Sequence, residues 1–329
     1  MNKKIFFDSI MTETGKKALP LLSFPSVSLM NVTVDELVRS SELQAKGMKM
    51  VADRVPSLAS VSMMDLSVEA EAFGSPLHFA ENEVPAVTDA IVTDMESAEA
   101  LRVPEVGDAR TGIYVRATEL AKTMITDRPV FSGVIGPFSL AGRLVGVSEA
   151  MILCCEEPEI MEVVLDKATE FLIKYIKAYK AVGADGIVMA EPLAGLLSPA
   201  LAEEFSEPYV KRIADAVKDD EFAVIYHNCG DFALRMTDSI VNTGCDAYHF
   251  GNSISMKEAL ELMPKDVPVM GNIDPAGQLR YGTPDSIREA VKKLMDECGG
   301  YKNFVPSSGC DIPHDTPWEN LDAFFNALA

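Results

Sequence analysis

The segment 223–230 carries a histidine and a cysteine two positions apart, His227 and Cys229. Because successive side chains of a β-strand point to opposite faces, these two side chains are expected on the same side of the chain. Another cysteine, Cys310, follows Gly309 much later in the sequence. Imidazole and thiolate are preferred ligands of zinc, and three such ligands leave one tetrahedral position open for chemistry. The residue types therefore predict a three-ligand zinc site, provided that Cys310 reaches the other two.

The elements that must position these residues alternate between strand and helix. Short apolar runs predict six strands, at residues 130–135, 185–190, 222–226, 246–250, 267–271 and 304–307. Two earlier candidate strands, at 19–24 and 59–64, bring the number to eight. Alternating strands and helices predict a parallel sheet, and eight such units close into a (β/α)8 barrel, the TIM barrel. An open doubly wound sheet is the alternative, but no Gly-rich dinucleotide fingerprint follows any strand.

Helix boundaries are signalled in the second half of the chain. Apolar residues at helical spacing predict a helix from about Pro158 to Ala181. Ser198 followed by Pro199 predicts a helix start, and Thr283 predicts another before the helix 284–298. The first third is less regular. Residues 33–55 are expected to be helical, residues 81–110 form an irregular excursion, and the whole chain, 1–329, is expected to be one domain.

In a barrel of this kind the active site lies at the C-terminal ends of the strands. The unusual polar residues of this chain follow predicted strands; they are Glu191, His227, Cys229, His249, Asn252, Asn272, Asp274 and Cys310. Glu191 is expected to act in catalysis, as a fourth metal ligand or by orienting His227, and a carboxylate that caps a helix is the alternative. Asp274 is expected to act in catalysis through a metal ligand, and Asn272 is a candidate for binding a cofactor.

The remaining cysteines and one histidine have ordinary structural explanations. Free cysteine often packs as a small hydrophobic residue, and four cysteines fall in or beside predicted helices: Cys154, Cys155, Cys245 and Cys298. His249 is expected to be a satisfied structural histidine outside the metal's ligand set.

The charge of the chain excludes a class of partners. The formal net charge is −21, from 50 acidic against 29 basic residues. A nucleic acid would be repelled by this field, and no basic cluster offsets it. No apolar run is long enough to span a bilayer, and the N-terminus lacks a secretory pattern. A cytoplasmic protein with reduced thiols is therefore expected.

Several segments carry a resemblance to a known family. They are Asp65–Gly74, Glu191-Pro192, His227–Gly230, Gly271–Asp274 and Ser308–Cys310 leading to Thr316–Leu321. With these the chain resembles the uroporphyrinogen decarboxylase superfamily, a (β/α)8 fold, and within it the branch of methylcobamide:coenzyme M methyltransferases.

The resemblance implies a chemistry for the predicted site. In that branch the His-x-Cys pair and the late cysteine are the zinc ligands, and they correspond to His227, Cys229 and Cys310. It implies that a zinc-activated thiol, such as coenzyme M, takes a methyl group from a methylated corrinoid. A separate corrinoid protein would be the partner and methyl donor. An anionic thiol needs a cation near the mouth, for which Arg143 and Arg280 are candidates.

Three other functions are alternatives. A true decarboxylase carries an Arg-rich segment after the first strand, but residues 21–28 contain no arginine, although Asp65 matches a functional aspartate of that branch. A donor-side methyltransferase would instead move a methyl group from an ether or amine onto a corrinoid. A binding protein with a structural zinc would have a closed site with a fourth protein ligand.

Overall fold

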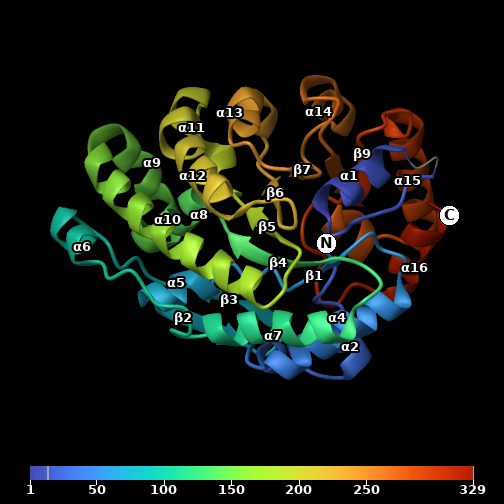
Figure 1. The fold of residues 1–329 in the computed structure, drawn as a ribbon, viewed down its shortest axis with the longest axis horizontal. Helices are drawn as coiled ribbons and strands as arrows, with labels where there is room; N and C mark the ends of the chain where they lie inside the picture. Colours follow the sequence, from blue (N-terminus) through green and yellow to red (C-terminus); the bar gives the residue numbers. More distant parts are fainter. Residues whose placement is uncertain (13–14, 329) are drawn as a thin grey trace.

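A parallel sheet of seven strands forms the centre of the molecule, as a computed structural model that describes residues 1–12 and 15–328 shows (Figure 1). The strands follow the order β1-β4-β5-β6-β7-β8-β9, and each neighbouring pair is parallel. Their bounds are Ser60–Val61 (β1), Val130–Ile135 (β4), Gly186–Ala190 (β5), Ala223–Asn228 (β6), Ala247–Phe250 (β7), Val269–Ile273 (β8) and Phe304–Ser308 (β9). Seven of the eight predicted strands are therefore present, and only the strand predicted at 19–24 is missing among the described residues. The strand predicted at 59–64 is shortened to two residues.

The segment predicted as the remaining strand is extended backbone that joins the two edges of the sheet. The Leu19 amide donates to the Pro306 carbonyl of β9 at 3.0 Å, and the Leu58 amide donates to the Ala18 carbonyl at 2.8 Å. The segment makes too few ladder bonds to be a strand, because the next amide on that side, that of Leu21, donates to the Ser308 hydroxyl and not to a backbone carbonyl. The fold is thus a curled parallel sheet of seven strands, whose edges residues 18–21 connect.

Helices cover the outside of the sheet, except for the N-terminal helix α1, whose Ile10 packs with residues enclosed by the sheet (Figure 1). The helices of the first half are α1 (Lys3–Thr12), α2 (Ser26–Met30), α3 (Val34–Val38), α4 (Ser41–Arg54), α5 (Val68–Phe73), α6 (Met95–Ala100), α7 (Thr111–Met124), α8 (Pro137–Val145) and α9 (Val147–Glu156). Those of the second half are α10 (Pro158–Ala181), η1 (Leu193–Leu196), α11 (Pro199–Phe205), α12 (Glu207–Val217), η2 (Ala233–Met236), α13 (Thr237–Asn242), α14 (Met256–Leu262), η3 (Pro275–Arg280), α15 (Pro284–Cys298) and α16 (Trp318–Asn326).

The predicted helix boundaries of the second half are confirmed. Helix α10 has the predicted range, and the Ser198 hydroxyl accepts from the Leu201 amide at the start of α11. Thr283 caps α15 in the same way. In the first third, the predicted helix 33–55 is interrupted between α3 and α4, where Ser40 is the N-cap of α4. The excursion 81–110 contains strand β3 (Glu83–Val87), which pairs antiparallel with β2 (Leu77–Ala80), and α6.

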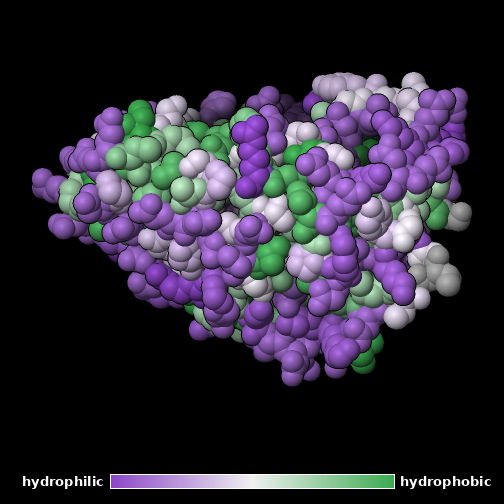
Figure 2. Space-filling model, turned by 90° about the horizontal axis from the view of Figure 1, so that it is seen from above, coloured by the Kyte–Doolittle hydropathy of each residue, from purple (hydrophilic) through white to green (hydrophobic). Residues whose placement is uncertain are grey.

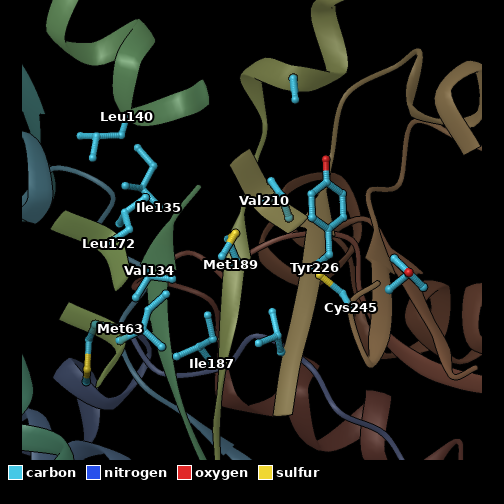
Figure 3. Close-up of a cluster of buried hydrophobic side chains, with 14 of the residues drawn as sticks. Met63, Val134, Ile135, Leu140, Leu172, Ile187, Met189, Val210, Tyr226 and Cys245 are labelled. Atoms are coloured by element: carbon cyan, nitrogen blue, oxygen red, sulfur yellow. The ribbon is translucent and has the colours of Figure 1, made fainter. Parts of the chain in front are cut away.

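Alternation along the strands divides the core into two layers. Ala223 and Ile225 of β6 belong to an inner cluster enclosed by the sheet, together with one or two residues from most other strands. The residues between them, Val224 and Tyr226, belong to an outer cluster between the sheet and the helices. Figure 3 shows part of this outer cluster, with Ile187, Met189 and Tyr226 of the sheet and the helix residues Leu140, Leu172 and Val210.

The outer surface is mainly hydrophilic, as the face drawn in Figure 2 shows. No single helix in residues 1–12 and 15–328 has the length and apolar character needed to cross a membrane. Helices α8 and α9 meet that test only as a pair, with a bend of 101° between them.

Candidate metal centre

Strand β6 brings His227 and Cys229 to the inside of the sheet. His227 follows Ala223 and Ile225 in the inward row, and its imidazole is 2% exposed. Cys229 comes one residue after the strand ends at Asn228 and is partly exposed. The C-terminal end of β6 is therefore where a buried imidazole and an accessible thiol lie on one side, as their spacing predicted.

Cys310 reaches this pair from the end of β9. Its sulfur lies 3.6 Å from His227 Nε2, although the two residues are 83 positions apart. Donor atoms of His227, Cys229 and Cys310 all lie within 4.8 Å of one another. No other His, Cys, Asp or Glu among the described residues completes this group.

Two glycines allow the loops to approach so closely. A Cβ atom on Gly251 would lie 2.6 Å from the Cα of Cys229, and one on Gly309 would lie 2.6 Å from the Asn252 amide nitrogen. Real Cβ atoms do not approach other atoms this closely, so a side chain at either position would push the loops that carry the cysteines apart.

Hydrogen bonding between the two thiols shifts both of their pKa values. A hydrogen bond with Cys310 lowers the pKa of Cys229 to about 7 against the cost of burial. The same bond, together with burial, raises the pKa of Cys310 to about 12. The pair therefore loses one proton readily and holds the second, so a nearby cation is needed to make both sulfurs anionic.

This donor set fits zinc. One imidazole nitrogen and two thiols are the ligand types of Cys₂His catalytic zinc sites, which keep a position for water or substrate. A dication also supplies the charge that the second cysteine needs before it ionises.

Behind His227 lies a buried chain of polar groups that sequence analysis did not assign. His227 Nδ1 is 2.8 Å from His249 Nδ1, and His249 Nε2 is 2.8 Å from the Ser307 hydroxyl. His249 is confirmed as a satisfied histidine, and burial together with the His227 ring lowers its pKa well below the ordinary value. The pairing had a signal in the sequence, because His227 and His249 each stand near the end of neighbouring predicted strands.

Glu191 points away from this group. It follows Ile187 and Met189 in the outward row of β5, and its Oε1 accepts from the Phe138 and Ser139 amides at the N-terminus of α8. Burial raises the pKa of its carboxyl to about 8, in spite of these bonds. The carboxylate caps a helix, which was the alternative explanation, and its catalytic role stays a prediction.

Asp274 and Asn272 make hydrogen bonds to the backbone near the end of β8. Asp274 Oδ1 accepts from the Ala276 and Gly277 amides and so caps η3. The Asn272 amide donates to the carbonyls of Gly251 and Ile254, which fixes the loop after β7. Both also line a cavity of about 420 Å³ with Asn252, Gln278 and Lys293. Their roles in catalysis and cofactor binding stay predictions.

The two candidate cations differ in their surroundings. Arg280 pairs with Asp315, and its buried Nε has no hydrogen-bond partner. It lines a cavity of about 370 Å³ with Asp311 and His314, in the loop that begins at Cys310. The Arg143 guanidinium is partly buried on α8, and burial lowers its pKa, although Asp65 and Glu69 oppose this effect.

Asp65 is engaged by cationic and hydroxyl groups. Its side chain is fully buried and forms an ion pair with Arg110. The Tyr114 hydroxyl donates to it at 2.7 Å, and the Ser67 hydroxyl donates at 2.5 Å. An aspartate held by three donors has little capacity left to bind the pyrrole groups of a tetrapyrrole.

Comparisons with known proteins identify the family. The family model described as uroporphyrinogen decarboxylase (URO-D) matches residues 26–329. A methylcobamide:CoM methyltransferase, MtbA of Methanosarcina acetivorans, is 31% identical over 263 residues, which are 78% of this chain and 75% of that protein. A uroporphyrinogen decarboxylase of Ruthia magnifica is 26% identical over 89% of this chain and 86% of that protein.

A solved structure supports the fold. A methyltransferase from Methanosarcina mazei superposes with a TM-score of 0.88 at 23% identity and covers 100% of this chain and 98% of that chain. The family match spans the sheet, the helices from α2 onward and the loops that carry His227, Cys229 and Cys310. The chain therefore belongs to the uroporphyrinogen decarboxylase (URO-D) family, and within that family it is an enzyme of the methyltransferase kind.

Proposed function

We propose that this enzyme moves a methyl group from a methylated corrinoid to a small thiol, with a zinc ion held by His227, Cys229 and Cys310. The observation that carries the proposal is the convergence of three zinc-type donors within 4.8 Å, without a fourth His, Cys, Asp or Glu of the described residues. A structural zinc would be expected to have four protein ligands, whereas a catalytic zinc has three and an open position. This difference favours an enzyme over a binding protein with a structural zinc.

The chain's own residues prepare this site in two ways. The inward row of β6 holds the His227 ring in place at 2% exposure, and the partly exposed cysteines leave a side of the site open. When bound, zinc would lower the pKa of a thiol in the remaining position and so supply a thiolate at neutral pH. The thiolates of Cys229 and Cys310 would offset the charge of the dication, so the substrate's sulfur would keep its electron density.

The reaction balances as a simple transfer. The carbon–cobalt bond of the methylated corrinoid breaks and leaves its electron pair on cobalt, which is reduced from Co(III) to Co(I). A carbon–sulfur bond forms, and the proton of the thiol is released. The names of the relatives, methylcobamide:CoM methyltransferase and methylated-thiol–coenzyme M methyltransferase, support a corrinoid as methyl donor and coenzyme M as acceptor. A separate corrinoid protein is the partner that we propose.

The anionic end of such a thiol would be held by Arg280. Its buried Nε lacks a partner, and it lines the cavity beside the loop that begins at Cys310. Arg143 does not line that cavity. A guanidinium donates well to sulfonate or carboxylate oxygens.

The test follows the visible spectrum of methylcobalamin mixed with the zinc-loaded enzyme, with and without 2-mercaptoethanesulfonate. We expect methyl loss that requires both the enzyme and the thiol, and that Cys310→Ala abolishes. Cys155→Ala is the matched control, because Cys155 is exposed and outside the site, and it should keep full activity. Methyl loss with no dependence on any thiol would contradict the proposal. Methylation of reduced cobalamin by a methyl ether or amine would instead establish a donor-side enzyme.

A further inference from the structure

We infer that His249, Ser307 and the Leu19 carbonyl form a hydrogen-bonded chain that fixes the tautomer of His227, so that Nδ1 carries the proton and Nε2 a bare lone pair. His249 and Ser307 are thereby positioning residues, which act on the metal site through His227. The consequence for metal binding rests on the proposed function, whereas the tautomer itself does not.

The series of hydrogen bonds begins at a group that can only accept a hydrogen bond, the Leu19 carbonyl. The Ser307 hydroxyl lies 2.7 Å from the Leu19 carbonyl oxygen, which has no proton to give. The single proton of the Ser307 hydroxyl therefore lies between these two oxygens. Toward any other neighbour, Ser307 Oγ acts as an acceptor.

The His249 ring is next in the chain. Its Nε2 lies 2.8 Å from Ser307 Oγ, which can only accept there, so Nε2 carries the proton of the neutral ring. A neutral imidazole has one proton, and His249 Nδ1 is therefore bare. Ser307 and His249 are both 0% exposed, so water is not available to reverse either bond.

The position of the proton on His249 then determines which nitrogen of His227 is protonated. The two Nδ1 atoms are 2.8 Å apart, and one proton must lie between them. Because His249 Nδ1 is bare, the proton belongs to His227 Nδ1. The lone pair of His227 is consequently on Nε2, the atom 3.6 Å from the Cys310 sulfur. This arrangement is the one a metal ligand needs, because the other ring nitrogen of a ligating histidine usually donates to a fixed acceptor.

The strand register explains how distant residues align. His227 and His249 are direct partners in the pairing of β6 with β7, so their side chains stand side by side inside the sheet. Ser307 lies on β9, and Leu19 belongs to the segment that connects the sheet's edges. The closure of the sheet and the order of protons at the metal site thus depend on the same buried atoms.

The first test measures the tautomers directly in zinc-free protein. The chain has four histidines, so ¹⁵N-histidine labelling and long-range ¹H–¹⁵N correlation can resolve each ring. Variants His78→Gln and His314→Gln assign the other two signals. We expect the Nδ1–H form for His227 and the Nε2–H form for His249. An Nε2–H form of His227 would overturn the inference, whether or not the protein binds zinc.

The second test asks whether the hydrogen bonds behind His227 affect the affinity for the metal. His249→Leu removes the acceptor, His249→Asn keeps a carbonyl oxygen near the position of Nδ1, and Ser307→Ala acts one step further away. We expect the affinity for Co²⁺ or Zn²⁺ to fall roughly 10–100-fold in His249→Leu, which is the usual effect when a ligating residue loses its hydrogen-bond partner. The affinity should fall by a smaller factor in His249→Asn. His78→Gln should bind like the parent, because His78 is exposed on β2.

The outcomes of the two tests separate the two proposals. If the tautomers are as inferred but the parent binds no zinc, the proposed function fails and the hydrogen-bonded chain stands. If the parent binds zinc and His249→Leu, folded by circular dichroism, binds it equally well, the positioning role is wrong.

Discussion

The chemistry at the scale of single residues depends on two thiols that compete for charge. Without a cation, the hydrogen bond between Cys229 and Cys310 lets only one of the two thiols ionise near neutral pH. A dication changes this balance, because it stabilises both thiolates together. In the proposed site the His227 ring would add a neutral ligand, and we infer that the groups behind it set which ring nitrogen is bare.

The proposed binding of the substrate's anionic group by Arg280 can be tested by substituting that residue. In Arg280→Gln we expect the KM for 2-mercaptoethanesulfonate to rise about 10–100-fold, since a hydrogen bond to a charged group contributes roughly 1.5–3 kcal/mol. The KM for uncharged 2-mercaptoethanol should change little, because no anion is held. Steady-state rates with both thiols measure this, and Arg143→Gln is the control. Equal rises for both thiols would assign Arg280 to folding of the loop.

At the scale of elements, the alternation of each strand decides which residues reach the site. In β6 the inward row carries Ala223, Ile225 and then His227, whereas in β5 the outward row carries Glu191 to the N-terminus of α8. The amide groups there favour the charged form of Glu191, but burial outweighs them and raises its pKa. Two strand ends that look alike in the sequence therefore have different structural roles.

The buried Glu191 should make stability depend on pH. Its pKa is raised to about 8 in the folded protein from an ordinary value of 4.5, so between these values the folded state holds a proton that the unfolded state has lost. The free energy of unfolding should therefore fall as pH rises through this range, by a few kcal/mol on the order of the shift. Glu191→Gln keeps the carbonyl acceptor without the charge.

The measurement is denaturant unfolding between pH 5 and pH 8 in the presence of a chelator. We expect a weaker loss of stability with rising pH in Glu191→Gln than in the parent. The exposed substitution Glu289→Gln should leave the parent's slope unchanged. An identical slope in Glu191→Gln and the parent would show that Glu191 does not hold the proton.

At the scale of the whole molecule, the net charge and the bonds of Asp65 argue against the substrate of a decarboxylase. The net charge is −21, which opposes a substrate with many carboxylates. Asp65, which was expected to correspond to a functional aspartate of decarboxylases, is held by Arg110, Tyr114 and Ser67. No arginine lies in residues 21–28 to bind such a substrate.

We therefore expect no conversion of uroporphyrinogen. The enzyme, loaded with zinc or freed from it, should leave uroporphyrinogen unchanged over hours, as chromatography of the oxidised porphyrins would show. A true uroporphyrinogen decarboxylase is the positive control in the same buffer. Products with fewer carboxylates would mean that the pocket accepts tetrapyrroles and that the exclusion by charge is wrong.

Local signals allowed most of the second half to be predicted from the sequence. Ser198 and Thr283 mark helix starts through side-chain bonds within a few residues, and the apolar run at 222–226 indicated strand β6. The segment at 19–24 was harder, because its extended form depends on hydrogen bonds to β9 and to the chain before β1. Its apolar composition alone could not tell a strand from a connecting segment.

The features of the site that depend on local spacing could also be predicted from the sequence. The spacing of His227 and Cys229 indicated a shared side, and the position of Cys310 after a strand indicated the same mouth. The direction of Glu191 depends on which face of β5 turns inward, and the hydrogen bond between His227 and His249 depends on the register of strand pairing. That register is fixed by the packing of the whole sheet, and a single sequence does not show it.

The measurement that tests the central claim most directly is the metal content of the purified protein, determined by inductively coupled plasma mass spectrometry. The parent and Cys155→Ala should each contain close to one zinc ion per chain. Cys310→Ala should retain far less, because one of three ligands is gone while the fold remains. Equal zinc in Cys310→Ala and the parent would contradict the account, since Cys310 would then not bind the metal.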